Sequence, residues 1–134
     1  MLCLDSKVLI DIINGHELVR ARFREARLSE NPLTTSALAV HEVFFGASIS
    51  TRPVVQTRSA LELLSTLTVV DFTSDDAVRA AELRSELRRS GQPIGGFDML
   101  IAGQALQREW TVVTANTREF SRVRGLTIED WSRP

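Results

Sequence analysis

Four acidic residues interrupt apolar stretches of the sequence at widely separated positions. Asp5 follows the apolar start MLCL, and Glu42 lies within ALAVHEVFFGA. Asp98 opens the apolar run after IGGF, and Glu119 follows TVVT by a few residues. Asp5 and Asp98 can cap helices and Glu119 can lie in a surface turn, so each has an ordinary explanation. Glu42 is harder to explain, because a lone glutamate is seldom buried without a partner or a metal.

Carboxylates that lie together would form an oxygen-rich site for a hard cation. They raise each other's pKa and cannot all stay ionised without positive charge. Oxygen ligands suit Mg²⁺ or Mn²⁺, whereas zinc favours histidine and cysteine. Acid-rich magnesium sites act on phosphates, where the metal neutralises charge and activates water. No nucleophilic side chain is then required. His41 adjoins Glu42 in sequence but would point about 100° away from it on a helix, so we do not expect it to act with this acid.

Apolar runs of two alternating kinds must position these residues. Helical patterns cover residues 7–14, 17–29, 37–47, 53–65, 75–90 and 97–109, with Ser36 and Ser74 as caps of the third and fifth. Short apolar runs predict strands at Leu2–Asp5, Pro32–Thr35, Leu67–Phe72, Thr111–Thr114 and Leu126–Ile128. This alternation is typical of a parallel sheet covered on both faces. We therefore predict an α/β fold, a three-layer α/β/α domain with a short parallel central sheet of four to five strands.

The carboxyl ends of parallel strands meet at one edge of the sheet, where such proteins bind their ligands. Asp5 ends the first predicted strand, and Asn116 and Glu119 follow the fourth. We expect these side chains to lie near one point together with Glu42 and Asp98.

Four segments carry the acidic residues in a characteristic order: LDSKVLIDII, ALAVHEVFFGA, IGGFDMLIAGQAL and TVVTANTREF, the last followed by GLTIEDW. In order and spacing they resemble the motifs of PIN-domain ribonucleases, and most closely those of VapC-like toxins of type II toxin–antitoxin modules. The resemblance covers essentially the whole chain. It implies a PIN-like fold in which Asp5, Glu42 and Asp98 hold Mg²⁺ or Mn²⁺.

The resemblance also bears on the residues around these acids. The family has a polar or acidic group after the fourth strand, in a pattern that Thr114, Asn116 and Glu119 match. Either Asn116, through its carbonyl oxygen or a hydrogen bond, or Glu119, through its charge, completes the site. Ser6 resembles a hydroxyl residue that contacts the site or a substrate phosphate. Arg118, beside Asn116, is our candidate for a phosphate contact.

The implied activity is Mg²⁺-dependent endonucleolytic hydrolysis of RNA, either tRNA or another structured RNA. The resemblance further implies a VapB-like antitoxin that covers the active groove, a homodimer of the toxin, and a toxin–antitoxin hetero-oligomer. The apolar segments Val8–Ile13 and Phe44–Phe45 could supply the docking surface or belong to the core. We expect no aromatic platform for stacked bases, since there is no tyrosine and the phenylalanines lie in apolar stretches.

Lys7, the only lysine of the chain, stands where the family usually has asparagine. At ~5 Å and an effective dielectric constant near 20, two unit charges interact by about 3 kcal/mol, enough to weaken metal binding. The ammonium could extend into solvent, or replace one metal's charge or contact phosphate. It could also leave a catalytically impaired PIN-like module that binds antitoxin or RNA without cleavage.

The composition is that of an ordinary globular protein, and we expect a single domain over residues 1–134. No apolar stretch approaches a membrane span and no signal peptide is evident, so we expect a cytoplasmic protein. The net charge of −1 gives no global attraction to nucleic acid. A receiver domain is disfavoured because no lysine follows Lys7. An aspartyl phosphatase is disfavoured because DSK replaces the D-x-D motif. Cys3 is expected to be a buried, inert thiol.

Overall fold

A five-stranded parallel sheet forms the centre of the computed structural model, which describes residues 1–134. The strands are β1 (Leu2–Leu4), β2 (Leu33–Ser36), β3 (Thr68–Val70), β4 (Thr111–Val113) and β5 (Thr127–Glu129). Their order is β3-β2-β1-β4-β5, and central β1 pairs in parallel with β2 and β4. The parallel sheet is confirmed, and every predicted strand is present within two residues of its expected ends.

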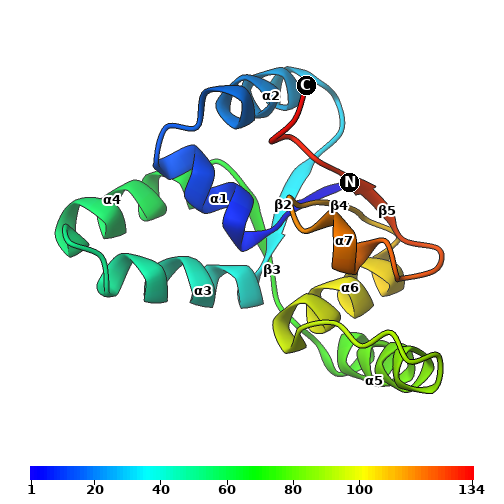
Figure 1. Cartoon of the computed structure of the whole chain (residues 1–134). Helices are drawn as coiled ribbons and strands as arrows, with labels where there is room; N and C mark the ends of the chain where they lie inside the picture. The colour runs from blue at the N-terminus through cyan, green and yellow to red at the C-terminus, as the bar shows by residue number, and fades with distance from the viewer.

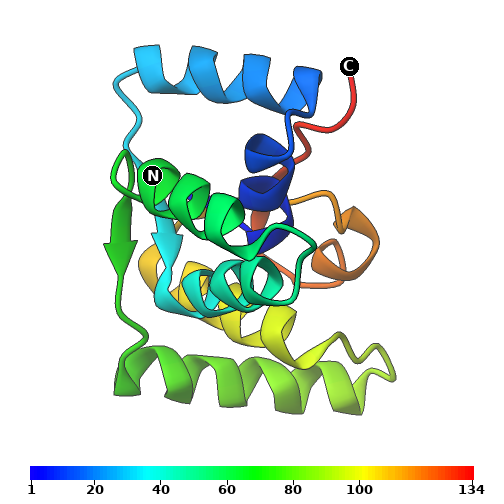
Figure 2. The same ribbon diagram turned by 90° about the vertical axis from the view of Figure 1, so that its left-hand side faces the viewer.

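Seven helices surround the sheet, and Figures 1 and 2 show α1–α4 on one side of it and α5 and α6 on the other. Their bounds are α1 (Ser6–Ile13), α2 (Glu17–Leu28), α3 (Ala37–Ser48), α4 (Pro53–Leu64), α5 (Ser74–Arg89), α6 (Gly96–Arg108) and α7 (Thr117–Phe120). The three-layer prediction is confirmed. Only α7 was not predicted, because four residues are too few to show a helical period. None of the helices is both long and apolar enough to span a membrane.

The side chains of the strands contribute to two separate hydrophobic cores, one on each face of the sheet. Leu2 and Leu4 pack with residues of α1–α4, whereas Cys3, between them, packs with residues of α5 and α6. Val113 and Val112 of β4 divide in the same way, as the two-residue period of a strand requires. Cys3 is a buried free thiol, as expected, and burial together with the nearby charge of Asp5 raises its pKa to about 12.

Helices α5 and α6 pack closely because α6 carries a glycine at their contact. A Cβ atom added to Gly103 would lie 2.5 Å from Ala80 Cα, a distance that no side chain tolerates. Ala80 is itself fully buried. The close approach therefore depends on two of the smallest residues facing each other, and it sets the position of α6 and of the acid at its start.

Of the two helix caps predicted from sequence, one is confirmed and one is wrong. Ser36 caps α3 as expected, accepting a hydrogen bond from the Leu38 N–H at 3.1 Å. The cap of α5 is Thr73 rather than the predicted Ser74. Thr73 and Asp76 form a capping box, in which each side chain accepts a hydrogen bond from the other's backbone N–H. This reciprocal pair satisfies two helix-end donors, whereas Ser74 in that place would satisfy one.

Candidate active site

Asp5 stands where β1 ends and α1 begins, at the carboxyl edge of the sheet. Only 5% exposed, it accepts a hydrogen bond from the Ser6 N–H at 2.8 Å through Oδ1. Its Oδ2 accepts a 3.0 Å hydrogen bond from Thr114 Oγ1, which follows β4. Burial raises the pKa of Asp5, and these hydrogen bonds oppose the rise without cancelling it. Asp5 therefore does more than cap α1, because its second carboxylate oxygen binds Thr114 at the end of the neighbouring strand β4.

A single amide joins the two acids of the later motifs. Asn116 Nδ2 donates hydrogen bonds to Asp98 Oδ2 and to Glu119 Oε2, both at 2.7 Å. Asp98 lies in the first turn of α6, and Glu119 lies in α7. A Cβ atom placed on Gly95 would lie 3.8 Å from each of these two oxygens, so the loop before α6 passes beside them. The amide therefore holds two carboxylates together at one side of the site.

The negative charge of Asp5 acts on acids of two other elements, Glu42 and Asp98. Burial, followed by the negative charge of Asp5, raises the pKa of Asp98 to about 6. The same two causes raise the pKa of Glu42, which the Ser6 hydroxyl partly offsets. The pKa of Glu119 is lowered, first by its hydrogen bond to the Asn116 amide. The charge of Asp5 is therefore felt both by Glu42 on α3 and by Asp98 on α6.

The structure thus brings together the acidic groups that the sequence predicted to converge. Three chain segments far apart in sequence and the loop after β4 contribute to this cluster, which contains Asp5, Glu42, Asp98, Asn116 and Glu119. Ser6 and Thr114 also lie within it, hydrogen-bonded to its carboxylates. Arg118 is exposed on α7, and in the sequence it stands between Asn116 and Glu119.

Lys7 does not face this cluster. Its side chain is 62% exposed, and its ammonium forms an ion pair with Asp11, one helical turn later on α1. Of the three arrangements considered for this residue, the structure shows the one in which the charge lies in solvent. The ammonium pairs with Asp11 rather than with a carboxylate of the cluster. A contact of Lys7 with substrate phosphate stays a prediction.

One aromatic pair beside the cluster was missed. The rings of His41 and Phe97 stack with centroids 5.6 Å apart and an angle of 16° between their planes. His41 precedes Glu42, Phe97 precedes Asp98, and Phe97 is 42% exposed. The phenylalanines were expected to lie in apolar surroundings, and this is wrong for Phe97, which lies at the exposed start of α6. Its position next to a candidate site acid was the available signal.

The donor chemistry of the cluster fits a hard divalent cation. Its candidate ligands are all oxygens, and none of its acids forms an ion pair with an arginine or lysine. Burial raises the pKa of Asp5, Glu42 and Asp98, and the negative charge of Asp5 raises that of the other two further, so a bound cation would offset a cost present in the folded chain. No three His, Cys, Asp or Glu side chains are grouped closely enough to hold a metal as they stand. Metal binding would therefore require these acidic side chains to come closer together than they lie here.

Comparison with known proteins agrees with this fold and site. A family model described as PIN domain matches residues 2–126. The chain therefore belongs to the PIN-domain family. Its relatives narrow the class to VapC proteins. The chain is 38% identical over 130 residues to the "tRNA(fMet)-specific endonuclease VapC" of Shigella flexneri, with 96% of each chain covered. It is 36% identical over 129 residues to the protein of that name in Salmonella typhimurium, again with 96% of each covered.

Solved structures of VapBC complexes share the fold over almost the full length. The DNA-bound VapBC of Salmonella typhimurium matches with a TM-score of 0.88 and 34% identity, covering 97% of both chains. VapBC2 of Rickettsia felis, bound to a promoter DNA fragment, matches with a TM-score of 0.90 and 29% identity. That match covers 97% of this chain and 98% of the other. The likeness thus extends to every element that positions the acidic cluster.

Proposed function

We propose that this protein is a metal-dependent endoribonuclease and the toxin of a toxin–antitoxin pair. The observation that carries the proposal is the amide of Asn116, which holds Asp98 and Glu119 beside a buried Asp5 whose charge also acts on Glu42. Such a concentration of uncompensated carboxylates destabilises the folded chain unless a cation is bound. The VapC names of the relatives support RNA as the substrate.

In this mechanism the ligands would be Asp5, Glu42 and Asp98. When bound there, Mg²⁺ or Mn²⁺ would neutralise charge on a scissile phosphate and lower the pKa of a water molecule. The chain's own groups orient the ligands: Thr114 holds Asp5, and Asn116 holds Asp98. Asn116 also donates a hydrogen bond to Glu119, which supports a shared role of the two candidates in completing the site.

Further residues are suited to hold RNA around the acids. The exposed Phe97, stacked on His41, offers an aromatic face to an unpaired base. Arg118, exposed on α7 next to Glu119 in sequence, is our candidate for a contact with phosphate. The alternative of an inactive binding module assumed a positive charge inside the site, and the ion pair of Lys7 with Asp11 argues against that assumption. Cleavage is therefore the better-supported activity.

The partner we propose is an antitoxin resembling VapB, in a hetero-oligomer with a homodimer of this chain. The complexes of similar structure are VapBC assemblies. The chain also exposes large apolar side chains on neighbouring helices: Phe45 and Ile49 at the end of α3, and Val54 and Val55 at the start of α4. Most of the segment Val8–Ile13, in contrast, lies in or against the core. Of the two segments considered from sequence, only Phe44–Phe45 contributes a strongly exposed side chain.

The activity is tested with purified protein and labelled RNA in Mg²⁺ or Mn²⁺. Initiator tRNA is the first substrate to try, because two relatives are named for it. We expect cleavage by the wild type, loss of cleavage in Asp98→Asn and in EDTA, and normal cleavage in Asp75→Asn. Asp75 is a matched control, since it is exposed on α5. Binding of RNA without cleavage by the wild type would instead support the binding module.

A further inference from the structure

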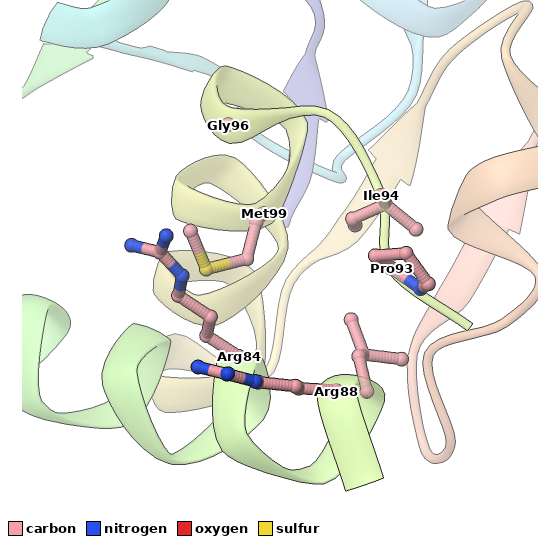
Figure 3. A pocket seen from close by; sticks show the side chains of 7 residues that line it. Arg84, Arg88, Pro93, Ile94, Gly96 and Met99 are labelled. Atoms are coloured by element: carbon pink, nitrogen blue, oxygen red, sulfur yellow. The ribbon is translucent and has the colours of Figure 1, made fainter. Parts of the chain in front are cut away.

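A pocket of about 410 Å³ lies between α5 and the loop that leads into α6. Figure 3 shows the side chains that line it. Leu87 from α5, Ile94 from the loop and Met99 from α6 form its apolar part. Two arginines of α5, Arg84 and Arg88, line the same pocket. The volume is within the range of small-molecule sites, about 300–1,000 Å³, and is large enough for one nucleotide.

The two arginines have no partner within the protein. Arg84 and Arg88 take part in none of the ion pairs or side-chain hydrogen bonds, and no acidic residue lines the pocket. Other arginines of the same region are paired: Arg79 with Glu82, and Arg108 with Asp76. Like charges spaced four residues apart on a helix repel each other. An anion bound between them would relieve that repulsion.

The pocket adjoins the acidic cluster through the loop before α6. Gly96 lines the pocket, while its neighbour Gly95 lies beside the carboxylates of Asp98 and Glu119. At the start of α6, Asp98 joins the cluster and the next residue, Met99, lines the pocket. The backbone that places a candidate site acid thus also forms one wall of the pocket.

The loop is held in this place from the other side. Arg122 Nη1 donates a 2.7 Å hydrogen bond to the carbonyl oxygen of Pro93, another residue of the pocket wall. Arg122 follows α7, which carries Glu119. The pocket wall and the acidic cluster are therefore tied to the same short segment that follows α7.

We propose that this pocket binds one nucleotide of the RNA strand next to the scissile phosphate. Arg84 and Arg88 hold its phosphate, because guanidinium groups match phosphate oxygens in charge and geometry. Leu87, Ile94 and Met99 contact the base or ribose. This inference rests on the proposed function and extends it, since it assigns a substrate subsite outside the acidic cluster. An RNA occupant, rather than a protein, is favoured by two neighbouring arginines without acidic partners, an apolar cavity of the size of a nucleotide and the loop that the pocket shares with the acidic cluster.

The test measures the affinity of the protein for a fluorescently labelled single-stranded RNA oligonucleotide by fluorescence anisotropy. EDTA is present so that the RNA is not cleaved. The double variant Arg84→Ala/Arg88→Ala should bind about tenfold more weakly. Its salt dependence should also be shallower by about 0.7 in the slope of log K against log salt, because the two arginines neutralise one phosphate of a single strand. AMP should compete with the RNA more strongly than inorganic phosphate does.

A matched control removes the same charge elsewhere. Arg89→Ala/Arg24→Ala takes two exposed arginines from α5 and α2, neither of which lines the pocket. We expect its affinity and salt slope to stay near those of the wild type. Equal losses in both double variants, or wild-type binding by Arg84→Ala/Arg88→Ala, would overturn the pocket assignment. So would a pocket variant that keeps RNA binding but no longer co-purifies with the antitoxin.

The two proposals fail in different ways. If the wild type does not cleave RNA in Mg²⁺ or Mn²⁺, the proposed nuclease activity fails, whatever the binding data show. If the wild type cleaves but its RNA affinity does not depend on Arg84 and Arg88, the nuclease stands and the pocket assignment fails. When cleavage occurs, the pocket variant should raise KM far more than it lowers kcat.

Discussion

The hydroxyl of Thr114 donates a 3.0 Å hydrogen bond to Asp5 Oδ2, between residues separated by 109 positions in sequence. The same hydroxyl accepts a hydrogen bond from the backbone N–H of Asn116, also at 3.0 Å. The buried Thr114 side chain therefore has two roles. It orients Asp5, and it begins the turn that contains Asn116, whose amide binds Asp98. The two halves of the acidic cluster are linked through this hydroxyl.

Replacing Thr114 with valine keeps the shape of the side chain and removes the hydrogen bond. The pKa of Asp5 should rise further, because that bond lowers it. The free energy of unfolding should fall by about 1–2 kcal/mol, the cost of leaving a buried acceptor without its donor. Chemical denaturation measures the change, and Thr114→Ser, which keeps the hydroxyl, is the control. Equal stability of the valine and serine variants would contradict the link.

Asp98→Asn should stabilise the metal-free protein at neutral pH while abolishing cleavage. The pKa of Asp98 is about 6 in the folded chain, against an ordinary value of 3.8. The Asp98 carboxyl group therefore stays protonated to a higher pH in the folded state than in the unfolded chain. Stability therefore falls as pH rises from about 4 to about 6, and the full cost is present above that window. Removing the charge should gain about 1 kcal/mol at pH 7.5 in EDTA, after allowance for solvent screening.

Denaturation at several pH values tests the sign of this effect. The advantage of the variant over the wild type should shrink toward zero as pH falls below about 4, where the carboxyl is protonated in both states. Asp75→Asn, at an exposed position, should show no such dependence. A variant that is less stable than the wild type at pH 7.5 would show that Asp98 is not held at an electrostatic cost.

Asp76 should have the opposite pH dependence. Burial raises its pKa, but hydrogen bonds from Arg108 and Thr73 outweigh that effect and hold it below the ordinary value. Its contribution is present above the unfolded pKa and is lost as pH falls through the lower folded value. Asp76→Asn should cost about 3 kcal/mol at neutral pH, because it leaves Arg108 without its buried partner. The wild type should lose this advantage below about pH 4 in acid denaturation; a constant difference would contradict the assignment.

Two glycines within helices should respond to alanine in opposite directions. Gly103→Ala forces a Cβ atom against the backbone of Ala80, so we expect a loss of at least about 2 kcal/mol in unfolding free energy. Gly46 has no atom near the place of its missing Cβ. Gly46→Ala should therefore stabilise α3 by about 0.5–1 kcal/mol through helix propensity. Thermal melts of both variants decide the matter, and destabilisation of equal size would contradict the packing argument.

The stacked pair beside the acids should bind substrate rather than take part in chemistry. Phe97→Ala should raise KM for RNA about fivefold or more, since stacking of one base contributes about 1–3 kcal/mol. The value of kcat should change little. Phe45→Ala is the control, because Phe45 is also exposed, at 58%, but has no stacking partner. A loss of kcat without a change of KM would show that Phe97 positions a site acid instead.

The elements could be predicted from sequence because their signals are local. The apolar runs of the strands and the capping residue Ser36 lie within a few positions of the structure that they specify. The convergence of the acids could also be predicted, since parallel strands place their carboxyl ends at one edge. The start of α5 was missed by one residue, because Thr73 and Ser74 both have a hydroxyl and only the hydrogen bonds with Asp76 distinguish them.

The sequence by itself therefore determined the order of the elements, the parallel sheet and the identity of the acids, all of which follow from residue type and spacing. Only the tertiary structure decided where individual side chains point. It paired Lys7 with Asp11, brought the amide of Asn116 between Asp98 and Glu119, and left Arg84 and Arg88 unpaired above an apolar pocket. Such contacts join residues from different elements, and their energies depend on distances that the order of residues along the chain does not specify.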